Sequence, residues 1–304
     1  MQKSEFSQGV FYALAAYILW GIAPLYFKAV DYVPADEILL HRIVWSCALL
    51  LVLVLLTGQV SAVKALLKQP RQVITLTFTA VLVAANWLLF IWAVNNDRLL
   101  EASLGYYINP LLNVALGMIF LGERLPKMQL VAVFIACFGV LIEVFHYGSV
   151  PWVSLLLAVS FGVYGLFKKK VKLQAVTGLF VETAILTPAA LLYWYGLDSS
   201  TSSFSANTLN VNMMLIAAGV VTTLPLLAFS AAAVRIPFYM LGLFQYIGPS
   251  MMFAMAIFLY NEPLDQAKLT TFVFIWSALL LFTFDMWRQS KKKLAAKSVG
   301  KALD

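Results

Sequence analysis

Long uncharged blocks of apolar residues dominate the chain, in place of apolar stripes at helical or strand spacing. Nine blocks contain no Asp, Glu, Lys or Arg, and a tenth is interrupted only by Glu182, about midway along it. A helix needs about 20 mostly apolar residues to cross the hydrocarbon layer of a bilayer. The pattern therefore predicts ten membrane-spanning helices. They cover residues 6–27, 43–63, 72–96, 102–122, 128–142, 151–167, 173–197, 199–234, 236–261 and 269–284.

The composition excludes a water-soluble domain and several kinds of site. Of 304 residues, 62% are hydrophobic and 12% are charged, against roughly 25% charged in soluble domains. The net charge of +7 comes from short basic runs between the apolar blocks and at the C-terminus, which is typical of contact with acidic lipid rather than nucleic acid. Cys47 and Cys137 lie inside apolar blocks without ligand spacing, so we expect no disulfide, metal or cofactor.

The basic residues also predict the orientation of the chain in the membrane. If the N-terminus is cytoplasmic, 17 of the 21 Lys and Arg residues fall in cytoplasmic segments. The four on the other side are Lys28, Arg42, Arg98 and Lys268. Because cytoplasmic loops carry an excess of Lys and Arg, we expect both termini in the cytoplasm.

The two halves of the chain share a motif at one common offset. A shift of 139 residues places residues 107–110 (YINP) on 246–249 (YIGP), and it also places Glu123 on Glu262. Each repeat then holds five helices, and an odd number makes the second copy start on the opposite side of the membrane. The expected fold is an all-α integral membrane protein of ten transmembrane helices, arranged as two inverted five-helix repeats.

The repeat sets the expected domain boundaries. We assign the first repeat to residues 1–146, the second to 147–286 and a basic cytoplasmic tail to 287–304. The tail has the composition of a disordered anchor to acidic lipid. Residues 198–210, rich in Ser, Thr and Asn, are expected to form a mobile external loop.

Four longer motifs stand out in the chain: residues 34–42 (PADEILLHR), 86–95 (NWLLFIWAVN), 101–110 (EASLGYYINP) and 244–249 (FQYIGP). They resemble the RarD branch of the EamA family, in the drug/metabolite transporter superfamily. The resemblance covers nearly the whole chain. It implies a bacterial inner-membrane permease whose central cavity is lined by helices one to four and six to nine, with the fifth and tenth peripheral. Proteins of this branch are commonly labelled chloramphenicol-sensitivity permeases.

Ionisable residues inside the spans are the first candidates for function. A charged side chain at membrane depth is costly and usually faces the bundle interior. Glu182 is therefore a candidate for proton coupling or for binding an amine, with a structural hydrogen bond to a neighbouring helix as the alternative. Arg42 could pair with Glu37 or attract an anionic substrate, although anchoring at the interface is the commoner role. His41 is a candidate pH sensor, although a lone interfacial His is more often a surface group.

Uncharged polar, aromatic and proline residues complete the candidate set. Polar groups avoid lipid and face the bundle, either linking helices or lining a cavity. Deep tryptophans can stack on a substrate or pack in the core, and interrupted helices in corresponding halves mark binding sites, although a packing kink is also consistent. The candidate cavity residues are Trp20, Arg42, Asn86, Trp87, Trp92, Asn95, Tyr106, Asn109, Thr222, Thr223, Gln245 and Tyr246, with helix breaks at Pro110, Pro225 and Pro249.

Together these features favour secondary-active transport of a small solute by alternating access, in the export direction. The sequence leaves proton coupling and a homodimer open. No P-loop, GxSxG or HExxH motif occurs, so neither direct use of ATP nor catalysis is expected. A channel is one alternative, and an intramembrane enzyme using Ser103 or Ser160 is another, although neither serine has an evident partner base.

Overall fold

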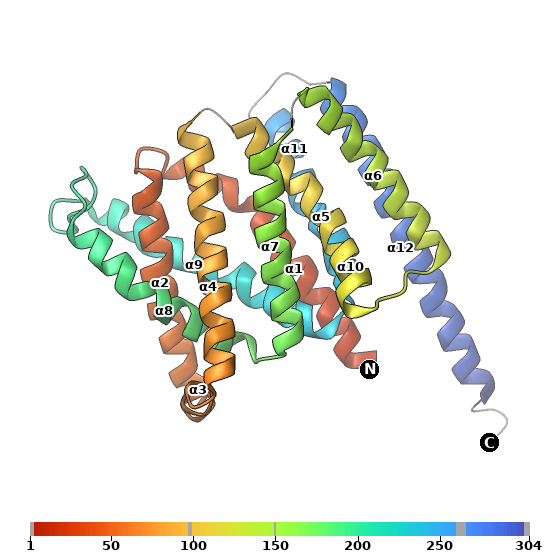
Figure 1. Cartoon of the computed structure of the whole chain (residues 1–304), viewed down its shortest axis with the longest axis horizontal. Coiled ribbons are helices and arrows are strands. Elements are labelled where there is room, and N and C mark those ends of the chain that lie inside the picture. Colours follow the sequence, from red (N-terminus) through yellow and green to blue (C-terminus); the bar gives the residue numbers. More distant parts are fainter. Residues whose placement is uncertain (1–2, 97–98, 149, 260–265, 301–304) are drawn as a thin grey trace.

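The computed structural model describes residues 3–96, 99–148, 150–259 and 266–300, and this part of the chain is almost entirely helical. Its helices are α1 (Lys3–Ala29), α2 (Ala35–Leu56), α3 (Val60–Leu67), α4 (Pro70–Asn95), α5 (Leu99–Leu121), α6 (Lys127–Tyr147), α7 (Trp152–Val171), α8 (Ala175–Tyr195), α9 (Leu209–Arg235), α10 (Phe238–Gln245), α11 (Ile247–Phe258) and α12 (Gln266–Gly300). Figure 1 places both ends of the chain on one side of the bundle, with α3 on that same side. We call this end the terminal face and the opposite end the distal face.

Among the described residues, nine helices are long and apolar enough to cross a membrane. The spans expected to be short are full length, because the helices continue through flanking charged residues. In this way α6 runs past Glu143 for 21 residues in all, and α7 includes Lys168 in its 20 residues. Charged side chains near a span end can keep their charged ends at the interface while the backbone stays helical.

The expected span 236–261 is not one continuous helix. It consists of α10 and α11, which meet at Tyr246. Pro249 has no N–H, so the carbonyl of Gln245 loses its helical donor, and Gly248 beside it lowers helix propensity further. The expected breaks at Pro110 and Pro225 are wrong, because α5 and α9 continue through these prolines.

Two segments expected to lack order are structured. Helix α12 extends to Gly300, so most of the 287–304 tail is helical rather than disordered. Its composition explains this, because Lys, Leu and Ala are all good helix formers. The 198–210 segment is held by hydrogen bonds from Asn207 Nδ2 to Thr201 O (2.7 Å) and from Asn212 Nδ2 to Phe204 O (2.8 Å), and α9 begins only at Leu209.

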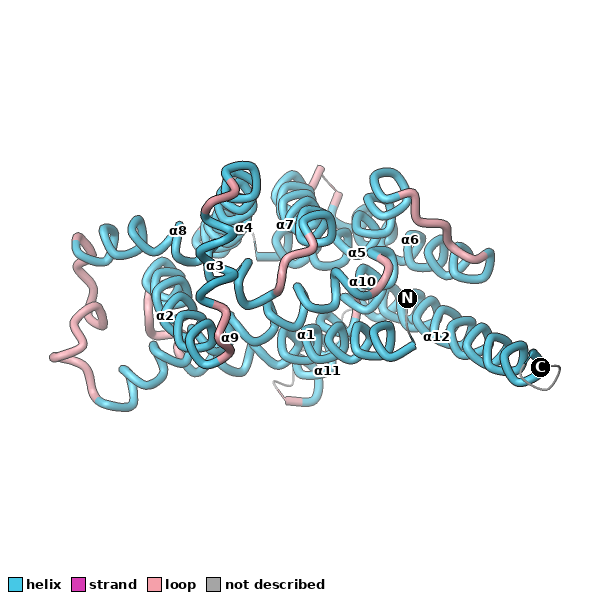
Figure 2. The backbone as a smooth tube through the Cα atoms, turned by 90° about the horizontal axis from the view of Figure 1, so that it is seen from below, coloured by secondary structure: helices cyan, strands magenta, loops and turns pink. Residues whose placement is uncertain are grey.

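Contacts between helices follow a two-fold pattern. The repeat makes α1 equivalent to α7, α2 to α8, α4 to α9 and α5 to α11. Exchanging equivalents turns the α1–α9 contact into α4–α7, the α2–α9 contact into α4–α8 and the α5–α7 contact into α1–α11, and all six contacts are present. Helices α2 and α8 contact each other as equivalents, and so do α6 and α12 at the edge of the bundle. Figure 2 shows the α8–α9 connector at one end of the molecule and α12 at the other. Each half therefore contributes equivalent helices to a shared centre.

The second half is also tied to the first by a carboxylate at a helix N-terminus. Glu123, in the α5–α6 connector, accepts hydrogen bonds from the backbone N–H groups of Phe238 (2.7 Å) and Tyr239 (2.9 Å) at the start of α10. A negative charge there compensates the positive end of the helix dipole. Its expected counterpart Glu262 lies outside the described residues.

Close backbone approach holds α2 against α9 where the halves meet. A Cβ atom on Gly219 would lie 2.5 Å from the carbonyl carbon of Trp45 and 2.8 Å from the amide nitrogen of Ser46. Both atoms belong to the α2 backbone, which cannot move aside as a flexible side chain can. Glycine at position 219 therefore sets the α2–α9 distance.

We predict that Gly219→Ala lowers the free energy of unfolding by about 1–3 kcal/mol, the usual cost of overpacking. The melting temperature of the purified protein in detergent measures it. Gly178→Ala is the matched control, because a Cβ there would meet nothing closer than 3.6 Å. Equal melting temperatures for both variants would contradict the close approach.

Candidate functional site

A small cavity lies between the two halves, with walls contributed by α2, α4, α7, α8 and α9. Its volume is about 20 Å³, which is room for about one water molecule. Five candidates from the sequence line it: Arg42, Trp87, Glu182, Thr222 and Thr223. The bundle is therefore closed around a polar centre, and a larger molecule fits only if helices separate.

Arg42 spans the centre of this cavity. Its Nε donates a hydrogen bond to Thr222 Oγ1 on α9 (2.9 Å), and its guanidinium carbon lies 4.5 Å from the centre of the Trp87 ring on α4. The ring of Phe27 lies on another side, 5.6 Å away. The expected alternative of a pair with Glu37 is wrong, because Glu37 contacts other residues.

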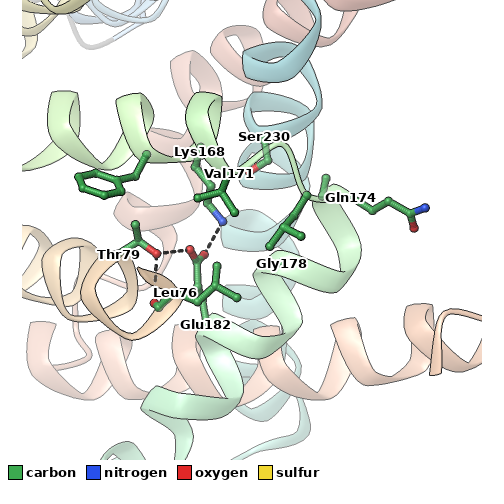
Figure 3. A pocket seen from close by; sticks show the side chains of 11 residues that line it. Leu76, Thr79, Lys168, Val171, Gln174, Gly178, Glu182 and Ser230 are labelled. Carbon is green, nitrogen blue, oxygen red and sulfur yellow. Dashed lines mark hydrogen bonds and ion pairs between the residues drawn. The ribbon is translucent and has the colours of Figure 1, made fainter. Parts of the chain in front are cut away.

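Glu182 is buried at the junction of α4, α7 and α8 (Figure 3). Its Oε2 lies 2.6 Å from Lys168 Nζ, and its Oε1 accepts a hydrogen bond from Thr79 Oγ1 at 2.6 Å. The hydroxyl of Tyr164 lies 3.5 Å from Oε2. The carboxylate therefore has both a charge partner and hydrogen-bond donors, as a buried charge requires.

A second cavity of about 20 Å³ lies on the terminal side of Glu182. Its lining includes Lys168 and residues 173–175, where α7 turns into α8. Glu182 lines both cavities and so forms part of the wall between them. It lies seven residues after the start of α8, about 10 Å along the helix. We call Thr79, Lys168 and Glu182 the terminal closure.

A second polar cluster closes the distal side. Glu37 on α2 is fully buried and accepts hydrogen bonds from Ser199 Oγ and from Thr201 Oγ1 (2.8 Å), both in the α8–α9 connector. Its Oε1 lies 3.6 Å from His41 Nε2. The ring of His41 packs against Trp194, with ring centres 4.6 Å apart. We call Glu37, His41, Ser199 and Thr201 the distal closure.

His41 is fully buried, so the expectation of a surface group is wrong. Its Nδ1 accepts a hydrogen bond from Trp45 Nε1 at 3.2 Å. An indole nitrogen only donates, so Nδ1 carries no proton and the neutral ring holds its proton on Nε2, facing Glu37. Trp194 on α8 and Phe204 in the connector pack against His41 and help to bury this pair, which a sequence cannot show.

The other polar candidates link helices. Asn86 Nδ2 donates to Leu157 O (2.9 Å) and Ser160 Oγ (2.7 Å) on α7, while Asn109 Nδ2 donates to Ala158 O (2.6 Å). Gln245 Oε1 accepts a hydrogen bond from Asn113 Nδ2 at 2.9 Å. These bonds join α4, α5, α7 and α10.

Tyr246, at the α10–α11 break, is fully buried. Its hydroxyl donates to Tyr107 O at 3.1 Å, so the two repeat-equivalent tyrosines meet.

The remaining aromatic candidates lie away from the cavity lining. Trp20 packs among aromatic rings, 5.8 Å from those of Phe161 and Phe229. Trp92 is 40% exposed on the outside of α4. Tyr106 is equally exposed. The side chains of Asn95 and Ser103 lie outside the described part of the chain.

Three comparisons with known proteins agree with this architecture. Residues 7–145 match the EamA-like transporter family. Protein RarD of Salmonella typhimurium is 52% identical over 96% of this chain and 100% of its own length. The Chloramphenicol-sensitive protein RarD of Pseudomonas aeruginosa is 32% identical over 94% and 97% of the two chains. One solved crystal structure has the same fold, with a TM-score of 0.73 and 16% identity over 91% of this chain and 98% of its own.

The chain belongs to the EamA-like transporter family, in its RarD branch. It is therefore a multi-pass membrane protein of the transporter class. An uncharacterized transporter of Vibrio cholerae is also 52% identical, over 93% of this chain and 94% of its own. In this EamA-like chain α6 and α12 pair with each other, and the cavity is lined by α2, α4, α7, α8 and α9.

Sequence reasoning missed the partners of the charged candidates in this EamA-like protein. Lys168 and Thr79 pair with Glu182, and Asn113 joins Asn109 to Gln245. A signal for Lys168 was available, because the short 172–174 connector keeps the end of α7 close to the start of α8. A lysine near the end of α7 is then brought beside the first turns of α8.

We predict that Lys168→Met costs about 3–5 kcal/mol of unfolding free energy, because it leaves the Glu182 carboxylate buried without its charge partner. The double variant Lys168→Met, Glu182→Gln removes both charges and should recover most of this loss. Melting temperatures in detergent measure both effects. Lys170→Met, on the exposed side of the same helix, is the control. A double variant no more stable than Lys168→Met would contradict the pairing.

Proposed function

We propose that this EamA-like protein is a secondary-active transporter that carries a small solute by alternating access through the cavity around Arg42. The observation that carries this proposal is a shared cavity with a polar closure at each end. The distal closure joins α2 to the α8–α9 connector, and the terminal closure joins α4 to α7 and α8. A carrier needs two barriers that open in turn, whereas an open pore needs neither.

The two closures differ in what would open them. At the terminal closure the Lys168–Glu182 ion pair is the main contact, so neutralising the carboxylate would weaken it. At the distal closure the hydrogen bonds to Glu37 would have to break. Because Glu182 also lines the central cavity, a proton and a solute could each act on it. This favours proton coupling at Glu182.

The proposed setting is the bacterial inner membrane, with both termini cytoplasmic. The distribution of basic residues supports this orientation. The terminal face would then be the cytoplasmic one, and Glu182 would lie on the cytoplasmic side of the cavity. Export is the proposed direction of net transport, with loading from the terminal face. One relative is named for sensitivity to chloramphenicol, so amphenicols belong in any panel of test solutes.

We predict that Glu182→Gln still folds and inserts but loses accumulation driven by a pH gradient. Glutamine keeps the shape of the side chain and removes the titratable group. The measurement is uptake into proteoliposomes, with a panel of radiolabelled amino acids, nucleobases and amphenicols. Asp285→Asn is the matched control, because Asp285 is a buried carboxylate that accepts a hydrogen bond from Gln129, in the peripheral α6–α12 pair.

Two results would contradict the proposal. Accumulation by Glu182→Gln equal to that of the unmodified protein would exclude the coupling role. Counterflow tests the carrier itself. A carrier accumulates labelled solute inside vesicles that were preloaded with excess unlabelled solute, and a pore does not. Equilibration of the solute across the vesicle membrane without counterflow would indicate a channel and not a carrier.

A further inference from the structure

Arg42 is a half-buried cation that lacks an acidic partner among the described residues. Among the described residues, no carboxylate lies within 4.0 Å of its guanidinium, and its one hydrogen bond uses Nε. The two terminal nitrogens of the guanidinium make no hydrogen bond within this part of the chain. Trp87 and Phe27 hold the group in place through their ring faces, which attract a cation but leave its N–H donors unused.

The charges on the cavity wall do not balance. Arg42 and Glu182 are the charged residues that line it, and Glu182 is already paired with Lys168. The half-buried guanidinium of Arg42 therefore has no acidic partner among the lining residues. Such a site attracts an anion, because each electrostatic contact is stronger at low dielectric than in water.

A second unsatisfied polar group lies in the same cavity. Thr223 lines it, is 1% exposed, and its buried hydroxyl has no hydrogen-bond partner. Buried polar groups in proteins are nearly always paired, so an orphan hydroxyl in a cavity wall indicates an absent ligand or water. Next to it, Thr222 already accepts the Nε–H of Arg42. The free donors of Arg42 and Thr223 thus belong to one site.

We propose that Arg42, with Thr222 and Thr223, forms a subsite for the carboxylate group of the transported solute. This inference rests on the proposed transport function and specifies its substrate class. A planar guanidinium fork with free terminal nitrogens matches a carboxylate with two parallel hydrogen bonds. One uncompensated charge suits a monoanion, whereas a phosphate dianion would leave a net negative charge in the site.

The rest of the cavity indicates an apolar body attached to that carboxylate. Its aliphatic lining consists of Ile43, Leu50, Val83, Leu179, Leu186 and Leu226. Trp87 adds an aromatic face beside the guanidinium. A solute with a carboxylate at one end and an aliphatic or aromatic group at the other would fit the Arg42 end and the apolar part of this lining, after the helices separate to enlarge the cavity.

The test compares two probes of nearly the same shape, 3-phenylpropionate and its uncharged amide 3-phenylpropionamide, in which an NH2 donor replaces one carboxylate oxygen. Binding to the purified full chain in detergent is followed by tryptophan fluorescence and by thermal stabilisation. We expect the carboxylate to bind at least about tenfold more tightly than the amide, the effect of one charge-assisted hydrogen bond. L-Phenylalanine, tested in parallel, distinguishes an amino acid from a simple organic acid as the source of the carboxylate.

Variants assign the preference to Arg42. Arg42→Gln should remove the discrimination, and Arg42→Lys should retain only part of it, because an ammonium cannot form the bidentate contact. Arg235→Gln should leave it unchanged. Arg235 is the matched control because its guanidinium also lies near an aromatic ring, that of Tyr12 (5.4 Å), yet hydrogen-bonds Ala231 O at the end of α9.

Each failure has a separate meaning. Equal affinity for acid and amide, no binding of the acid, or an unchanged preference in Arg42→Gln would overturn the carboxylate subsite. The comparison within the unmodified protein decides the question even if a variant does not fold. Carboxylate binding without counterflow in proteoliposomes would instead contradict the transport function and leave the subsite standing. Counterflow of uncharged solutes alone would support the transport function and contradict the carboxylate subsite.

Discussion

The cost of an unpaired charge away from water is the constraint that organises this protein. In a bilayer no water is available to replace a lost hydrogen bond, so ionised and strongly polar groups must find partners inside the bundle. Glu182 meets this requirement through Lys168 and Thr79, and Glu37 meets it through Ser199 and Thr201. Both sets of partners come from other helices or from a connector, so satisfying the charge also joins elements that are distant in sequence.

This requirement places the polar contacts where two equivalent halves meet. The helices that form the cavity walls come from both halves of the chain, while α6 and α12 pair at the edge. A closure made of one ion pair and a few hydrogen bonds can be broken by neutralising a single group. The same physical chemistry that stabilises the closed bundle therefore offers a way to open it at one end.

The bundle and several cavity residues could be predicted from the sequence, because both follow from the free-energy cost of placing individual side chains in lipid. Long apolar blocks predict spans, and Arg42, Glu182 and Thr222 stand out as groups that lipid would reject. It could not predict partners, since these depend on which helices meet. Arg42 contacts Thr222, which is 180 residues away, rather than Glu37 on its own helix. The burial of His41 was not predictable for the same reason, because the rings that pack against it are Trp194 on α8 and Phe204 in the α8–α9 connector.

Alternating opening of the two closures is the central claim, and distances across both of them test it most directly. Spin labels at Tyr32 and Ser205 report on the distal side, and labels at Arg71 and Lys170 report on the terminal side; all four positions are exposed. Pulsed electron resonance in nanodiscs, at neutral and at acidic pH, gives both distance distributions. We expect acid to lengthen the terminal distance while the distal distance stays short. Simultaneous lengthening of both pairs, or no change in either, would contradict the account.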